Sequence, residues 1–130
     1  MVRSTHRRTI EITTESHLTE RGDCIVGVRA NKAAAGLRED VREAIKTQGS
    51  EITFRFEVAR ESFVVRAFGS PSLTLSSDEE MVIRKSEFIS PRTVGIRADA
   101  ASVDMPRTMV ERLRTDADCI GMLTIEVMVA

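Results

Sequence analysis

Hydrophobic and polar residues alternate along residues 51–59, EITFRFEVA. One side of the chain therefore carries the side chains of Ile52, Phe54, Phe56 and Val58. A period of two is typical of a β-strand with one buried face. The polar residues 60–62 that follow predict a tight turn into a hairpin partner. Similar apolar or alternating patterns predict further strands at residues 8–14, 24–30, 63–69, 81–88, 93–98 and 121–130.

The period changes to about four in two places, which predicts two amphipathic helices. The apolar positions that recur with this spacing are Leu37, Val41 and Ile45 within residues 31–48, and later Met105, Met109 and Leu113. Gly49 is expected to end the first helix, because glycine readily adopts the left-handed conformation that follows a helix. Asp104 is expected to cap the start of the second helix with its carboxylate.

The phrase GVRANKAA at residues 27–34 returns as GIRADAAS at residues 95–102, 68 positions later. The helical apolar positions follow with the same offset, and one extra residue in the second copy precedes its last strand. The sequence therefore predicts two similar strand–strand–helix–strand halves, at about residues 9–59 and 81–130.

These elements predict an α+β class with a mixed, mostly antiparallel sheet and two helices, in a single domain over residues 1–130. Two arrangements remain open, an open sheet with the helices on it or a small closed barrel. Residues 18–28, LTERGDCIVGV, favour the barrel, since they resemble the Gly-Asp box of cradle-loop and double-psi barrels. Here, however, the Gly-Asp pair precedes the strand that enters the helix, whereas in those barrels it follows the helix.

Composition narrows the function classes. Hydrophobic residues make up 42% of the chain, and the net charge of −1 does not favour a generally basic nucleic-acid binder. Trp and Tyr are absent, which argues against a platform of stacked aromatic rings for bases. Apolar runs are too short to span a bilayer and the N-terminal residues lack the apolar core of a signal peptide, so we expect a cytoplasmic protein with no membrane partner.

Cysteine and histidine are too sparse to indicate a metal site. The two cysteines, Cys24 and Cys119, form no paired motif and are expected to be buried free thiols. The two histidines, His6 and His17, have no clustered ligands around them. We expect neither a metal nor a cofactor.

Three blocks of sequence together carry a family resemblance: THRRTIEIT at 5–13, LTERGDCIVGVRANKA at 18–33 and MVIRKSEFISPRTVGIRADAA at 81–101. With them the chain resembles, over nearly its entire length, an archaeal protein family known as domain of unknown function 371 (DUF371). The resemblance implies a small cytosolic protein, and it implies no particular activity.

Residues 83–93, IRKSEFISPRT, hold the most promising polar cluster. Its cations are Arg84, Lys85 and Arg92, and its hydroxyl donors are Ser86, Ser90 and Thr93. On a strand, Arg84 and Ser86 would share one face. Such donors bind phosphate or carboxylate through charge-assisted hydrogen bonds, which predicts an anion-binding module for a nucleotide or an RNA phosphate. His6, Arg21 and Asp23 are expected to extend this ligand site.

Three other interpretations stay open. In one, the cations of residues 83–93 pair with Glu87 and with the acidic residues 78–80 on a solvated sheet face. In another, the protein is an enzyme with His6, Asp23 and Cys24 in a cleft between the halves. In the third, it is a structural or interaction subunit that oligomerises through an exposed strand such as residues 124–130. Independently, we expect Glu11 to form a cross-strand ion pair with Arg29.

Overall fold

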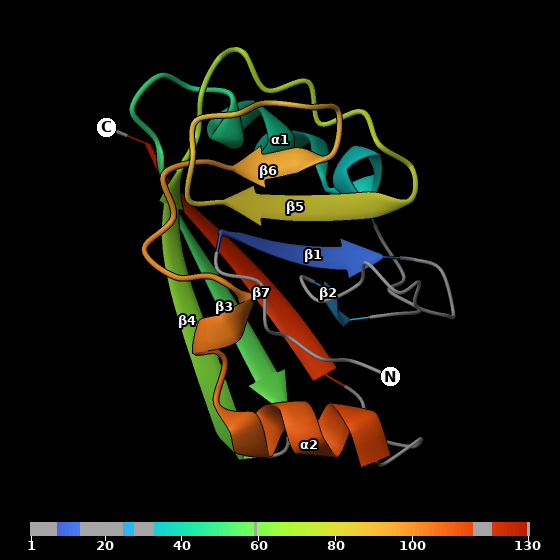
Figure 1. The fold of residues 1–130 in the computed structure, drawn as a ribbon. Helices are drawn as coiled ribbons and strands as arrows, with labels where there is room; N and C mark the ends of the chain where they lie inside the picture. Colours follow the sequence, from blue (N-terminus) through green and yellow to red (C-terminus); the bar gives the residue numbers. More distant parts are fainter. Residues whose placement is uncertain (1–7, 14–24, 28–32, 59, 116–120, 130) are drawn as a thin grey trace.

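The computed structural model describes residues 8–13, 25–27, 33–58, 60–115 and 121–129 (Figure 1). Along the chain these residues form seven strands, two α-helices and two short 3-10 helices. They are β1 (Thr9–Thr13), β2 (Ile25–Gly27), η2 (Ala34–Gly36), α1 (Glu39–Ile45), β3 (Glu51–Val58), β4 (Glu61–Phe68), β5 (Glu80–Arg84), β6 (Thr93–Gly95), η3 (Ser102–Asp104), α2 (Arg107–Thr115) and β7 (Gly121–Met128).

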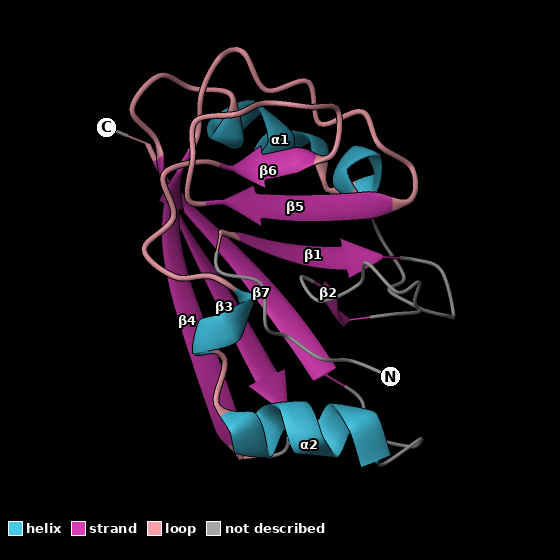
Figure 2. Ribbon diagram, in the orientation of Figure 1, coloured by secondary structure: helices cyan, strands magenta, loops and turns pink. Residues whose placement is uncertain are grey.

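The strands form two sheets, with the order β2-β1-β5-β6 in sheet A and β4-β3-β7 in sheet B (Figure 2). Three strand pairs are antiparallel, β1 with β5 and β3 with both of its neighbours, whereas β2 and β6 run parallel to the strands beside them. The predicted α+β class with a mixed, mostly antiparallel arrangement is confirmed. The described strands do not close into a barrel, and a single bridge between Phe68 and Ile96 connects the two sheets.

Strand β3 shows why the alternating sequence folds as it does. Its apolar residues Ile52 and Phe54 are completely buried, and its polar positions face outward. It pairs over its full length with β4 on one side and β7 on the other. The hairpin predicted at residues 60–62 is confirmed, since Val58 pairs with Glu61 across the turn.

Both helices are shorter than the apolar spacing predicts. Each is preceded by a 3-10 turn, and the residue that ends this turn, Leu37 or Met105, has an extended backbone. The helical spacing therefore continues across a break. The prediction that Asp104 caps α2 is wrong, because Asp104 ends η3 and its carboxylate accepts the N–H of Ala101. Gly49 does not end α1, because the helix ends at Ile45 with Lys46 as its C-cap. Gly49, with a φ of 76°, lies in the following turn, which the hydrogen bond from Ser50 N–H to Thr47 O closes.

The structure repeats element by element, as the two related phrases predict. In each half a strand pairs in parallel with the next one, with a register irregularity, and a 3-10 turn and a helix follow before the last strand. Equivalent strands meet antiparallel, β1 with β5 and β3 with β7, and each helix contacts the other half's last strand. This arrangement is the one that a twofold axis between the halves requires. Among the described strands, β4 has no counterpart in the second half.

Gly95, from the second copy of the phrase, lets β6 approach sheet B closely. A Cβ atom added to Gly95 would lie 3.1 Å from the Phe54 ring and 3.1 Å from the Cβ of Ala67. The core lies between the sheets, where residues of both halves form one hydrophobic cluster. Sheet A has one face in this cluster. On its other face Glu11, Val82 and Thr93 are buried too, and Glu80 and Arg84 are partly exposed.

Candidate functional site: a polar face on sheet A

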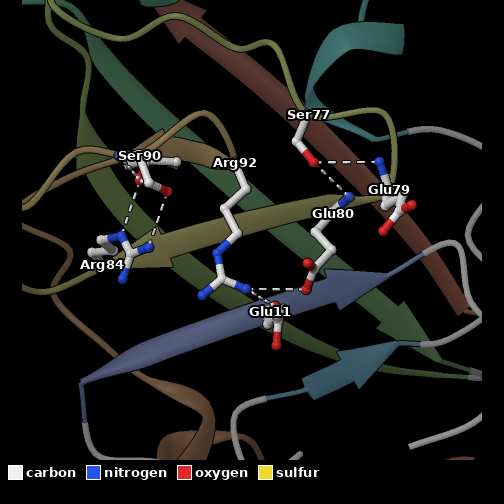
Figure 3. Close-up of polar contacts among 8 residues, drawn as sticks. Glu11, Ser77, Glu79, Glu80, Arg84, Ser90 and Arg92 are labelled. Atoms are coloured by element: carbon white, nitrogen blue, oxygen red, sulfur yellow. Dashed lines mark hydrogen bonds and ion pairs between the residues drawn. The ribbon is translucent and has the colours of Figure 1, made fainter.

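The alternation of β1 and β5 separates core side chains from polar ones. Ile10 pairs with Ile83 and Ile12 with Met81, and all four are buried in the core. The positions between them place Glu11, Glu80 and Arg84 on the opposite face (Figure 3). Val82, which pairs with Glu11, lies on this face as well and is 2% exposed. We call this surface the polar face of sheet A.

At one end of the polar face, hydroxyl groups hold the guanidinium of Arg84. Its Nε donates to Thr93 Oγ1 at 2.9 Å and its Nη2 donates to Ser90 Oγ at 3.2 Å (Figure 3). Its terminal carbon also lies 4.8 Å from the centre of the Phe88 ring, a side chain that is 62% exposed. Because several contacts fix it, the guanidinium has a defined orientation.

At the other end, Arg92 joins two carboxyl groups from neighbouring strands. Its Nη1 donates to Glu11 Oε1 at 2.6 Å and to Glu80 Oε2 at 3.1 Å (Figure 3). The Glu11 side chain is only 9% exposed, that of Glu80 is 29% exposed and that of Arg92 is 42% exposed. Burial and fixed geometry strengthen such a pair relative to one in water.

The Glu80 carboxyl keeps its proton to a higher pH than a solvated glutamate, because its pKa is raised. The pKa of Glu80 is raised from 4.5 to about 7, mainly by its hydrogen bond with the Glu11 carboxyl, and further by burial and by the charge of Glu11. Arg92 opposes this shift without cancelling it. Two carboxyl groups in contact cannot both ionise easily, so one of them stays protonated to a higher pH.

The predicted site residues are only partly brought together. Arg84 and Arg92 lie on the same face of β5 (Figure 3). The predicted strand 81–88 is wrong beyond Arg84, because Lys85 and Ser86 lie in the bend that follows β5. Here the chain pairs with a later segment, as Ala98 N–H donates to Arg84 O and Arg97 N–H donates to Ser86 O, both at 3.0 Å.

Lys85 and Ser86 have partners other than a ligand, Lys85 in η3 and Ser86 within the bend. Lys85 Nζ lies 3.9 Å from a carboxylate oxygen of Asp104, and Ser86 Oγ accepts the N–H of Phe88. The predicted residues His6, Arg21, Asp23 and Cys24 lie outside the described residues, as does Arg29, the expected partner of Glu11. Among the described residues, Glu11 is bonded to Arg92.

The interpretation that acidic neighbours neutralise these cations is correct for Arg92, which pairs with Glu80. The Glu87 carboxylate, in contrast, lies near Arg97, with its Oε1 3.9 Å from Arg97 Nε. Arg97 has a φ of 53°, in the left-handed region, and its guanidinium lies 4.5 Å from the Phe68 ring. A non-glycine residue in this region is uncommon and indicates a backbone that its surroundings constrain.

Sequence reasoning missed the pairing of Glu11 with Glu80. The two residues are distant in the sequence, and no local pattern connects them. The internal repeat offered a signal, since a twofold relation between the halves places the two equivalent first strands side by side. That relation would have placed Glu11 beside the acidic end of the segment 78–80.

Two general findings complete the description. Among the described residues, no group of three or more His, Cys, Asp or Glu side chains is arranged to hold a metal ion. Neither described helix is long and apolar enough to cross a membrane.

The fold and the polar face define a small α+β protein made of two similar halves, with charged and hydroxyl side chains on one face of its mixed sheet. The chain belongs to the family described as Domain of unknown function (DUF371), which it matches over residues 1–127. It is 34% identical over 119 residues to "Uncharacterized protein MJ0206" of the archaeon Methanocaldococcus jannaschii, across 92% of this chain and 87% of that protein. The family resemblance found in the three sequence blocks is confirmed, and neither description names an activity.

Proposed function

We propose that this protein is a small anion-binding module whose ligand carries a phosphate group, as a nucleotide or an RNA does. The observation behind the proposal is that Arg84 and Arg92 lie on one face of β5, with the hydroxyl groups of Ser90 and Thr93 beside Arg84 (Figure 3). Guanidinium and hydroxyl donors on one surface suit the several acceptor oxygens of a phosphate.

The fixed guanidinium of Arg84 supports binding in a second way. Ordering a long side chain on binding costs free energy, roughly 0.5–1.5 kcal/mol for a side chain with many rotamers. Arg84 is already oriented by Thr93 and Ser90 before a ligand arrives. The exposed ring of Phe88 next to it offers apolar surface to a ligand that carries a base.

At Arg92 a ligand must compete with two carboxyl groups, because Glu11 and Glu80 already accept hydrogen bonds from its guanidinium. An anion that contacts Arg92 therefore either displaces one of these carboxylates or shares the guanidinium with it. Glu80 is the carboxyl group more easily neutralised, since its pKa is raised to about 7. Loss of its charge leaves more of the positive potential of Arg92 for a ligand.

Thermal unfolding at low ionic strength, with phosphate, nucleoside triphosphates or a short single-stranded RNA, tests the proposal. A ligand at ten times its Kd stabilises the folded state by about 1.4 kcal/mol, or a rise in Tm of roughly 3–6 °C. We expect this rise in the wild type, a smaller one in Arg84→Ala and a larger one in Glu80→Gln. Each shift is measured against the same variant without ligand.

Arg55→Ala is the matched control, because Arg55 is an exposed arginine on the outward side of β3, in the other sheet. It removes one positive charge from the protein and leaves the polar face intact, so its ligand-induced shift should equal that of the wild type. If no anion raises Tm at low ionic strength, or if Arg55→Ala reduces the shift as much as Arg84→Ala does, the proposed site is wrong.

A further inference from the structure

Strand β7 ends sheet B on one side, and its outer edge differs from that of β4 at the other end. The outer edge of β4 is partly covered by residues 96–99. Phe68 exchanges two backbone hydrogen bonds with Ile96, at 2.8 and 2.9 Å, and Arg66 is bonded to Asp99 through both its N–H and its carbonyl. Among the described residues, β7 pairs with β3 alone.

The side chains of β7 fit an uncovered edge. Met122 is 66% exposed and Met128 is 71% exposed on the outward side. On the inward side, Leu123, Ile125 and Val127 are packed against the core but only partly buried. Their partners on β3 are buried, with Ile52 and Phe54 at 0% exposure. Apolar surface is therefore left incompletely covered on both sides of this strand.

The edge also lacks the usual protection against pairing. Natural edge strands carry lysine, proline or a bulge that prevents another strand from adding to them. Residues 121–129, GMLTIEVMV, contain no proline and no basic residue, and their one charge is Glu126. Strand β7 pairs with β3 over eight residues without a register shift. A long, regular and apolar edge of this kind favours strand addition.

We propose that β7 pairs antiparallel with β7 of a second copy of this chain, about a twofold axis at Ile125. The sequence is complementary to itself in this register. Leu123 then lies opposite Val127 on the inward side, Met122 opposite Met128 on the outward side, and Thr124 opposite Glu126. Each side chain faces one from the same side of the sheet, as strand pairing requires.

Charge disfavours one neighbouring register that also keeps the sides matched. A shift that centres the axis on Glu126 would place two glutamates directly opposite each other, which is destabilising. With the axis at Ile125, each Glu126 faces a threonine. The net charge of −1 also opposes association of two copies only weakly. The dimer would have one continuous sheet in the order β4-β3-β7-β7-β3-β4, and this proposal is independent of the anion site.

Sedimentation velocity over a wide range of protein concentration tests the pairing. We expect the wild type to shift from one chain to two as concentration rises. In Met122→Lys/Met128→Lys, lysines meet across the axis and apolar contact is lost, so association should weaken at least roughly tenfold. Within one chain these lysines lie opposite Glu57 and Glu51 of β3, so the variant is expected to fold.

Two further variants test the register and the surface. In Met122→Lys/Met128→Glu, the lysine of one copy meets the glutamate of the other, and association should return. Val64→Lys places a lysine on the outward side of β4, where Val64 is 38% exposed, and should leave the dimer unchanged. If the wild type sediments as one chain at every concentration, the proposal is wrong, and the edge is then available to a strand of another protein. A dimer that persists in the double lysine variant, or that Val64→Lys abolishes, overturns it as well.

Discussion

Two glutamates and one arginine on the polar face of sheet A show how neighbouring charges modify one another. Glu11 and Glu80 lie close enough to share a hydrogen bond, and Arg92 donates to both. One arginine offsets one negative charge, so a second ionised carboxylate in the same place is unfavourable. The polar face therefore holds a proton that a solvated glutamate would have lost.

The raised pKa of Glu80 makes stability depend on pH in a definite direction. Its pKa is about 7 in the folded protein, above the usual 4.5, so the folded state binds this proton more tightly than the unfolded state does. The stabilising contribution is fully present below about pH 4.5 and is lost as pH rises through 7. We expect the free energy of unfolding to fall between pH 5 and pH 8 more steeply in the wild type than in Glu80→Gln.

Urea unfolding at a series of pH values measures this difference. Glu79→Gln is the matched control, because Glu79 is the exposed neighbour of Glu80 in the sequence. The control should keep the slope of the wild type. Equal slopes for Glu80→Gln and the wild type would contradict the assignment of the proton to this carboxyl pair.

At the level of elements, close packing between the sheets requires small residues at some positions of the repeated phrase. Gly95 ends β6 where the chain passes over Phe54, and the free space is smaller than a methyl group requires. The same phrase supplies Ala101, which is completely buried directly before η3, just as its equivalent Ala33 is buried directly before η2. Small residues at these positions let strand, turn and helix fold back against the core.

Gly95→Ala is expected to lower the free energy of unfolding by about 1–3 kcal/mol, the usual effect of excess volume in a packed core. The added methyl group would lie 3.1 Å from the Phe54 ring. Phe54→Leu removes part of that ring, so Gly95→Ala should be less harmful in this background. A double-mutant cycle by urea unfolding measures the coupling, and additive effects would contradict the proposed contact.

At the level of the whole molecule, the two halves cooperate because equivalent strands pair with each other. Each sheet contains strands of both halves, because β1 pairs with β5 and β3 pairs with β7. The helices are exchanged in the same way, since α1 contacts β7 and α2 contacts β3. The hairpin strand β4 breaks this symmetry and leaves β3 as the central strand of sheet B, with β7 at its edge.

Amide hydrogen exchange should differ between the central strand β3 and the edge strand β7. The amides of β3 are expected to exchange most slowly, because β3 has a paired strand on each side and a fully buried inner face. Amides of β7 that point away from β3 should exchange faster in dilute solution and slow down at high protein concentration, where the proposed dimer forms. Protection of β7 equal to that of β3 at every concentration would contradict this order.

For the proposed anion site, the sequence showed the local cluster of residues but not their partners from distant parts of the chain. The cluster of residues 83–93 contains Arg84 and Arg92, whose side chains lie on the same face of β5 (Figure 3). It gave no indication that Arg92 is bonded to Glu11, a residue near the start of the chain. The strand assigned to 81–88 ended early because residues 97 and 98 pair with its continuation, a contact between segments that no local pattern encodes.

The sequence by itself determined the period of each element, the internal repeat and hence the α+β class, because side-chain spacing reflects local backbone geometry. Only the tertiary structure decided which strands became neighbours and whether they closed a barrel. It alone placed Glu11 beside Glu80 and left β7 at an edge. Strand pairing joins residues that are distant along the chain, and its energy depends on how well whole faces pack together, which no short stretch of sequence contains.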